Sequence, residues 1–233
     1  MSNILIIPDT HSRDFWKPAK QLVNNYDKII FLGDYVDPYP YEFTLSVNEL
    51  RLKTLADFQE IIEFAKNNSN VILLDGNHLL HYINPALACS RYDYYIANDI
   101  KAMYKSNKSL FHSYYCIDNI LFTHAGISEE WVQDMQILKQ YQKIKTDNII
   151  ELLNNCSIEE LMTCGPYRGG NSRHSGPEWL DVHEFEWLTP LSDYYQIFGH
   201  TQLNNPIITD QYACLDTRQL YVLNTETKQI TYA

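Results

Sequence analysis

The sequence has few cationic residues, and none of them are gathered into a run. Among its 233 residues are 18 Lys and Arg against 29 Asp and Glu, which gives a formal net charge of −11. Proteins hold nucleic-acid phosphates with clusters of Lys and Arg, so this balance argues against a nucleic-acid partner. A local cationic pocket is still compatible with this charge, because bound metal ions would themselves supply positive charge.

Paired cysteines and long apolar runs are also missing. The five cysteines are scattered and form no C-x-x-C pair, which favours reduced thiols in the cytosol over a disulfide framework. No run approaches the ~18 apolar residues that a membrane span needs. The start of the chain lacks the basic and then apolar stretch of a secretory signal. We therefore expect a cytoplasmic protein with no membrane partner, folded as one domain over residues 1–233.

What the sequence does contain is five short polar segments, each directly after an apolar run. The segments are Asp9–His11, Gly33–Asp37, Gly76–His78, His124–Gly126 and Gly199–Thr201. The short, β-branched runs before them are typical of buried strands. In open α/β sheets, ligands collect at the carboxyl ends of the strands. Carboxylate, imidazole and amide groups from several strand ends therefore predict a site for divalent metals.

Strands and helices alternate in the first half of the chain, which predicts right-handed βαβ units, parallel pairing and an α/β fold. Helices are expected over 15–24 and 46–67, near 128–143 and over 147–162. A tyrosine-rich stretch over 79–109 is expected to be helical and to form a cap beside the site.

The last part of the chain has a different composition. Residues 164–178 contain four glycines and two arginines, which is typical of an ordered loop, and we expect this loop to face the substrate. Short strands, which would add an antiparallel sheet, are expected over 206–210, 212–216, 219–224 and 228–232.

Taken together and in this order, the five polar segments resemble the D-x-H, G-D-x-x-D, G-N-H, H and G-H-x motifs of the calcineurin-like metallophosphoesterase superfamily. The match spans residues 9 to 201. The resemblance implies a four-layer αββα sandwich that binds two divalent metal ions. Manganese is the foremost candidate, with iron, zinc or nickel as alternatives.

The resemblance also implies six metal ligands. These are Asp9 and His11 for the first ion, Asp34 as the bridge, and Asn77, His124 and His200 for the second ion. Oxygen and nitrogen donors of this kind suit borderline-to-hard divalent ions. Two such ions can clamp a phosphate and acidify a bridging water, and the resulting hydroxide would attack phosphorus.

His78 follows the implied ligand Asn77 directly, and the resemblance makes it the general acid that protonates the leaving oxygen. Asp37 is then expected to accept a hydrogen bond from the other nitrogen of the His78 ring and so to fix its tautomer.

The chain departs from its relatives where they bind phosphate. Pro38 and Asp75 stand where many relatives have arginine. Another cation should replace those arginines, and Arg168 and Arg173 are our candidates because guanidinium binds phosphate bidentately. Arg91 is a third possibility.

Four further positions are less informative. Gln202 stands where other branches have a second histidine, and a hydrogen bond near the metal is favoured over ligation. His81 is one helical turn beyond His78, and a surface or packing role is favoured for it. His112 and His183 are expected to be structural or exposed.

These observations predict a binuclear metal-dependent phosphoesterase that acts on a phosphorylated small molecule or a phosphoprotein. A phosphomonoesterase of the bacterial or phage protein-phosphatase type is favoured. A dinucleoside polyphosphate or phosphodiester hydrolase is the alternative, and the run His124–Ile127 resembles the dinucleoside tetraphosphatase and protein-phosphatase branches alike. A non-catalytic metal-binding interaction module is the alternative from another class.

Overall fold

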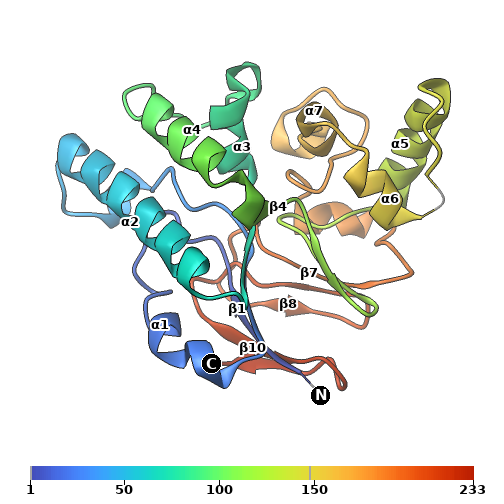
Figure 1. The fold of residues 1–233 in the computed structure, drawn as a ribbon. Helices are drawn as coiled ribbons and strands as arrows, with labels where there is room; N and C mark the ends of the chain where they lie inside the picture. The colour runs from blue at the N-terminus through green and yellow to red at the C-terminus, as the bar shows by residue number, and fades with distance from the viewer. Residues whose placement is uncertain (1, 147) are drawn as a thin grey trace. The chain divides into compact units, whose positions relative to one another are not determined.

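The computed structural model describes residues 2–146 and 148–233, which form two compact units (Figure 1). Unit 1 comprises residues 2–112 and 218–233, and unit 2 comprises the described residues of 113–217. Each unit combines one mixed sheet with helices. The predicted fold class is therefore confirmed: the fold is α/β with two mixed sheets, as an αββα architecture requires.

Unit 1 contains a six-stranded sheet in the order β11-β10-β1-β2-β3-β4. Its strands are β1 (Asn3–Ile7), β2 (Lys28–Phe31), β3 (Val71–Leu74), β4 (Phe111–His112), β10 (Tyr221–Asn224) and β11 (Ile230–Tyr232). Strands β1 to β4 are parallel, as the alternation of strands and helices predicts, whereas β10 is antiparallel to both β1 and β11. The carboxyl ends of β1, β2 and β3 therefore lie along one edge, and the first three polar segments begin there.

The helices of unit 1 confirm some sequence predictions and correct others. They are α1 (Ala19–Leu22), α2 (Val47–Asn67), α3 (Asn77–Ile83) and α4 (Ala97–Ser106), with 3₁₀ turns at Val23–Asn25, Pro40–Glu42, Pro85–Leu87 and Lys108–Leu110. The helix predicted over 46–67 is confirmed. The prediction over 15–24 was too long, because residues 15–18 form turns before α1. The stretch 79–109 is helical only in part, since 88–96 has no helix.

Helix α2 is the longest helix of the unit and lies beside α4 (Figure 1). Its start is fixed by a capping box, in which the Ser46 hydroxyl accepts from the Glu49 amide and the Glu49 carboxylate accepts from the Ser46 amide. The buried Phe58 ring stacks on Tyr35 at 5.7 Å and contacts Phe111 at 5.9 Å between ring centroids. This packing holds the loop after β2 against the helix.

Unit 2 contains a five-stranded sheet in the order β5-β6-β7-β9-β8. Its strands are β5 (Tyr115–Ile117), β6 (Ile120–Phe122), β7 (Tyr195–Phe198), β8 (Ile207–Ile208) and β9 (Tyr212–Cys214). Strands β6, β7 and β9 are parallel, while β5 and β8 are antiparallel to their neighbours. The ends of β6 and β7, where the last two polar segments begin, are thus adjacent.

The helices of unit 2 are α5 (Glu129–Tyr141), α6 (Ile149–Asn154) and α7 (Ile158–Leu161), with 3₁₀ turns at Pro166–Arg168 and Val182–Glu186. Helix α5 confirms the prediction near 128–143. The helix predicted over 147–162 is instead two short helices, because Ser157 caps a new one; its first position, 147, lies outside the described residues. Residues 164–178 form the predicted loop, apart from the turn at Pro166–Arg168.

The separate antiparallel sheet predicted for the end of the chain was wrong. Strands were found within all four predicted segments, but they extend the two existing sheets. Strand β10 pairs with β1 in unit 1, and β9 pairs in parallel with β7 in unit 2. The edges of β1 and β7 carry backbone groups that can pair with these last strands. Composition alone does not reveal where such edges form. Among the described residues, no helix has the length and apolarity to cross a membrane.

Replacing Phe58 by alanine should lower the free energy of unfolding by about 3–5 kcal/mol, because it leaves a cavity beneath Tyr35 and Phe111. Urea denaturation measures this loss. The control is Leu52→Ala on the same helix, where the side chain is 68 % exposed and the loss should stay below about 0.5 kcal/mol. Equal losses in the two variants would contradict the packing described here.

Candidate metal and acid site

The first group of site residues lies at the carboxyl edge of the unit 1 sheet. Asp9 follows β1, Asp34 follows β2, and His11 lies between them in contact with both loops. All three are buried, and each offers a ligand atom within 4.8 Å of the other two. The His11 amide donates to the Asp34 carbonyl at 2.8 Å, and His11 Nε2 lies 3.6 Å from Asp34 Oδ2.

The donor set of this group fits a divalent cation. Asp9 and Asp34 bring two carboxylates into a buried place, where a cation offsets their charge. Burial is the main cause that lowers the pKa of His11 to about 3, so its imidazole is neutral, and neutral imidazole is the form that ligates metals. His11 Nδ1 is 2.7 Å from the Val36 carbonyl, which fixes the ring and leaves Nε2 facing Asp34.

Asp34 also connects this group to the start of α3. Its Oδ1 accepts a hydrogen bond from the His78 amide at 2.9 Å. The approach requires glycine at position 76, because a Cβ there would lie 2.4 Å from Asp34 Oδ1. Asn77, the first residue of α3, is buried, and its amide group is 3.8 Å from Cys89 Sγ. The loop after β2 and the start of α3 are thus held together by direct contacts.

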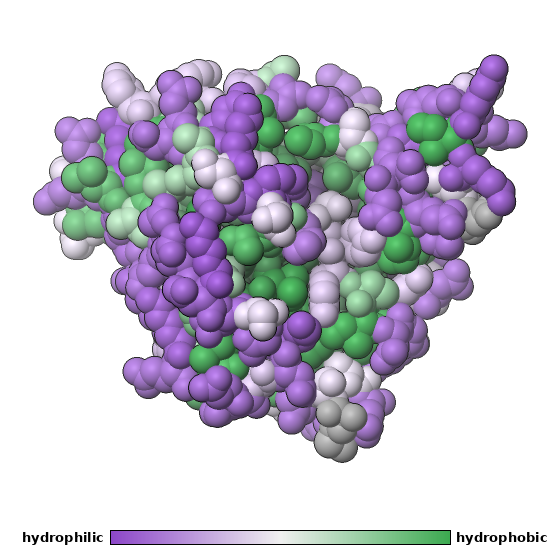
Figure 2. All heavy atoms as spheres, viewed as in Figure 1, coloured by the Kyte–Doolittle hydropathy of each residue, from purple (hydrophilic) through white to green (hydrophobic). Residues whose placement is uncertain are grey.

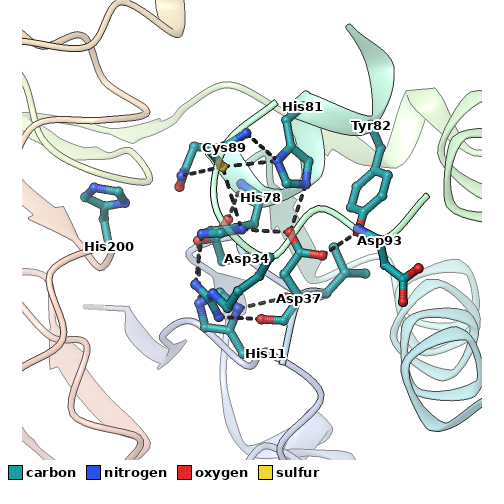
Figure 3. Close-up of polar contacts among 12 residues, drawn as sticks. His11, Asp34, Asp37, His78, His81, Tyr82, Cys89, Asp93 and His200 are labelled. Carbon is teal, nitrogen blue, oxygen red and sulfur yellow. Dashed lines mark hydrogen bonds and ion pairs between the residues drawn. The ribbon is translucent and has the colours of Figure 1, made fainter. Parts of the chain in front are cut away.

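The second group is centred on Asp37 (Figure 3). Asp37 Oδ2 lies 2.7 Å from His78 Nδ1 and 2.8 Å from His81 Nε2, and Oδ1 accepts a hydrogen bond from the Tyr82 hydroxyl. Burial alone raises the pKa of Asp37, but the hydrogen bonds from His78 and His81 outweigh burial and hold it below its usual range. The ionised Asp37 accepts a hydrogen bond from His78 Nδ1–H, which leaves His78 Nε2 as the ring nitrogen that can accept a hydrogen bond.

Arg91 is the hydrogen-bond donor next to His78 Nε2. Its Nη2 lies 2.9 Å from His78 Nε2, and its Nη1 donates to the Asp37 carbonyl. The guanidinium also lies 3.7 Å from the centre of the Tyr39 ring, a cation–π arrangement. Of the three arginines that the sequence analysis named, Arg91 is the one found beside the proposed acid.

His81 is a supporting residue whose role the sequence analysis understated. It is fully buried, and its Nδ1 lies 3.1 Å from Cys89 Sγ while its Nε2 faces Asp37. His78, His81 and Tyr82 are spaced i, i+3 and i+4 on α3, so they share one helix face. That spacing was the available signal. Burial and the nearby Asp34 and Asp37 raise the pKa of Cys89, so its thiol stays protonated.

Unit 2 brings together the two remaining predicted ligands. His124 follows β6, His200 follows β7, and the Gly199 amide donates to the His124 carbonyl at 2.8 Å. The His124 Nε2 and His200 Nδ1 atoms are 3.2 Å apart. Two imidazoles from adjacent parallel strands, with ring nitrogens facing each other, are a donor pair suited to one transition ion.

The arginines of the 164–178 loop have acidic partners. Arg168 Nη2 lies 2.6 Å from Asp181 Oδ2 and donates to the Thr201 hydroxyl, which places Arg168 next to the His200 segment. Arg173 is 79 % exposed, and its Nη1 is 3.6 Å from Asp134 Oδ1.

The other polar positions lie nearer the surface. His112 is exposed and His183 contacts Asp181, as expected for structural or exposed roles. Gln202 is exposed as well, and the hydrogen bond near the metal stays a prediction for it.

The chain is similar to known proteins over most of its length. A sequence model described as calcineurin-like phosphoesterase matches residues 2–203. No curated protein sequence matches the chain. Among solved structures, a metallophosphoesterase from Sphaerobacter thermophilus is 14 % identical with a TM-score of 0.47, covering 99 % of this chain and 87 % of that one. Yfce, a phosphoesterase from E. coli, is 11 % identical with a TM-score of 0.38, covering 98 % of this chain and 96 % of that one.

Because both TM-scores are below 0.5, the assignment depends on the family match, which covers most of the chain. Members of this family bind divalent metal ions and hydrolyse phosphoester bonds, and the buried Asp and His groups described above are candidate metal sites. The chain belongs to the calcineurin-like phosphoesterase family and is a metal-dependent phosphoesterase.

Proposed function

We propose that this protein is a binuclear phosphomonoesterase of the protein-phosphatase type, with His78 as its general acid. The observation that carries the proposal is the double attachment of His78. Its amide donates to the metal-ligand candidate Asp34, and its ring is held by Asp37. An acid is useful only when it is fixed relative to the phosphate, and here the same loop and helix that carry the candidate ligands also position the acid.

The proposal assigns one ion to Asp9 and His11 and a second to Asn77, His124 and His200, with Asp34 shared. Its support is the order of the family motifs and the oxygen and nitrogen donors in each unit. This mixture of donors suits manganese foremost, with iron, zinc or nickel as alternatives. When bound, such ions lower the pKa of water towards neutrality and stabilise negative charge on phosphate.

The residues of the chain supply the remaining steps. Asp37 orients the His78 ring so that Nε2 faces the bond to be broken. For the acid step the ring takes up a proton at Nε2, where Arg91 lies in this structure, and that proton then passes to the leaving oxygen and leaves the ring neutral. Arg91 supplies a guanidinium beside Nε2 that is suited to a phosphate oxygen. We keep Arg168 and Arg173 as further substrate ligands. Arg168 has the stronger support because it contacts Thr201, next to His200.

Replacing Asp34 by asparagine should remove metal and activity together, because it deletes the carboxylate that both ions are proposed to share. Losing a supporting partner of a metal ligand already weakens metal affinity about 10–100-fold, so a direct ligand should cost at least that. Metal content after dialysis against manganese, together with phosphate release, measures both effects. Asp27→Asn, an exposed acid before the same strand, is the matched control. Full manganese content in Asp34→Asn would remove this residue from the ligand set.

Replacing His78 by asparagine should leave metal content unchanged and lower turnover by about 10²–10⁴-fold. The loss should be larger for an alkyl phosphate than for p-nitrophenyl phosphate, because nitrophenolate leaves without help from an acid. The measurement is kcat for both esters in the metal-loaded protein, with exposed His112→Asn as the control. If the two esters lose turnover equally, His78 does not protonate the leaving oxygen.

A further inference from the structure

Unit 1 contains a pocket of about 170 Å³ beside the acid group. It lies between the loop after β2, the first turns of α2 and the segment 91–96. Most of its wall is apolar, formed by Pro38, Pro40, Leu45, Val47, Leu50 and Ile96. Exposed apolar residues Leu45 and Val47 mark its rim, and apolar side chains gather over the start of α2 at the upper left of Figure 2.

The polar end of the pocket is formed by the groups that hold His78. Asp37 and Arg91 both line the pocket. Asp37 Oδ2 is 2.7 Å from His78 Nδ1, and Arg91 Nη2 is 2.9 Å from His78 Nε2 (Figure 3 shows His78 and Asp37). The pocket therefore begins within one hydrogen bond of the atom that is proposed to give up the proton.

That position limits what can occupy the pocket. A general acid must lie within hydrogen-bond reach of the leaving oxygen, so the rest of the leaving group extends away from His78 Nε2. Arg91 is held in place by the Asp37 carbonyl and by the Tyr39 ring, and its side chain separates Nε2 from the apolar wall. A phosphate oxygen at Arg91 would direct the attached alcohol towards that wall.

The volume limits the occupant further. A cavity of about 150 Å³ lined by apolar side chains holds a benzene molecule, whereas drug-sized ligands occupy about 300 Å³ or more. At 170 Å³ the pocket accommodates one six-membered ring. Arg51, Thr54 and Asp93 also line the pocket, and Arg51 and Asp93 are paired with each other at 2.6 Å.

We propose that this pocket is the leaving-group subsite and that it selects phosphate monoesters of alcohols carrying a single apolar ring. This inference rests on the proposed function, since it names the substrate class of the same acid. Arg91 holds the phosphate end next to His78, Asp37 holds the His78 ring, and the wall from Pro38 to Ile96 buries the substrate's ring. The preference for such substrates then comes from the apolar surface of the ring that binding removes from water.

The test compares benzyl phosphate with ethyl phosphate, because both release an alkoxide and differ mainly in the ring. The pocket-filling variant is Val47→Trp, at a rim residue that is 64 % exposed, so folding should be preserved. The control is Leu52→Trp, 68 % exposed on the same helix and outside the pocket wall. In the unmodified protein, kcat/KM should favour benzyl phosphate by roughly ten- to hundredfold, chiefly through KM. Val47→Trp should abolish that ratio and Leu52→Trp should keep it.

A binding measurement separates this proposal from the proposed function. Benzyl alcohol titrated into metal-free protein, followed by NMR, should shift resonances of residues around Val47 and Ile96, and should fail to do so in Val47→Trp. Binding without hydrolysis of either ester would support the pocket and overturn the phosphomonoesterase assignment. Hydrolysis with equal kcat/KM for the two esters, or equal preference for 1-naphthylmethyl phosphate, would overturn the single-ring subsite.

Discussion

The hydrogen bond from the His78 amide to Asp34 Oδ1 is the constraint on which the unit 1 site depends. It connects the loop after β2 to the first turn of α3, and it forms only because position 76 has no Cβ. The bond positions the Asp34 carboxylate beside the N-terminus of a helix, where partial positive charge favours an anion. It also sets the place of the His78 ring, since the ring belongs to the residue whose amide is held. The candidate ligand and the candidate acid therefore cannot move independently.

Asp37 holds the side chain of His78, as Asp34 holds its backbone amide. A buried carboxylate is stable only with enough donors, and Asp37 has three of them on α3, from His78, His81 and Tyr82. Removing one partner of such a buried group costs about 1–3 kcal/mol. His81 and Tyr82 thus do more than fill space: they keep Asp37 ionised and fixed when His78 exchanges its proton. Tyr82 is itself held, because its oxygen accepts from the Asp93 amide at 3.1 Å. This bond links the acid group to the segment that carries Arg91.

Much of the site could be predicted because the alternation of strands and helices can be recognised from local sequence patterns. Asp9, Asp34 and Asn77 follow three strands that pair in parallel, so their meeting at one edge follows from the alternation of strands and helices. His124 and His200 follow the parallel neighbours β6 and β7 for the same reason. Arg91 could not be predicted in this way. It lies in the irregular stretch 88–96, where no helix or strand periodicity indicates which way a side chain faces. Its partners Asp37 and His78 are 54 and 13 residues away along the chain. The placement of the last strands failed for a related reason, since pairing with β1 or β7 depends on edges that form only in the folded chain.

Backbone strain in the described residues gathers at these same segments. Ten residues other than glycine have φ in the left-handed region, and six of them belong to the polar segments or contact them directly: His11, Ser12, Asp34, Asp37, Arg91 and His200. Such conformations cost on the order of 1–3 kcal/mol each and persist only when the surroundings hold them. Here the holding contacts are visible. The His11 amide bonds the Asp34 carbonyl, the Ser12 amide bonds the Tyr35 carbonyl, and Arg91 bonds the carbonyl of Asp37. These two backbone hydrogen bonds and the Arg91 guanidinium connect the loops, so the free energy stored at these residues is offset by bonds between the loops. The carboxylates and imidazoles are consequently fixed in place before any phosphate arrives, which is the condition that electrostatic catalysis requires.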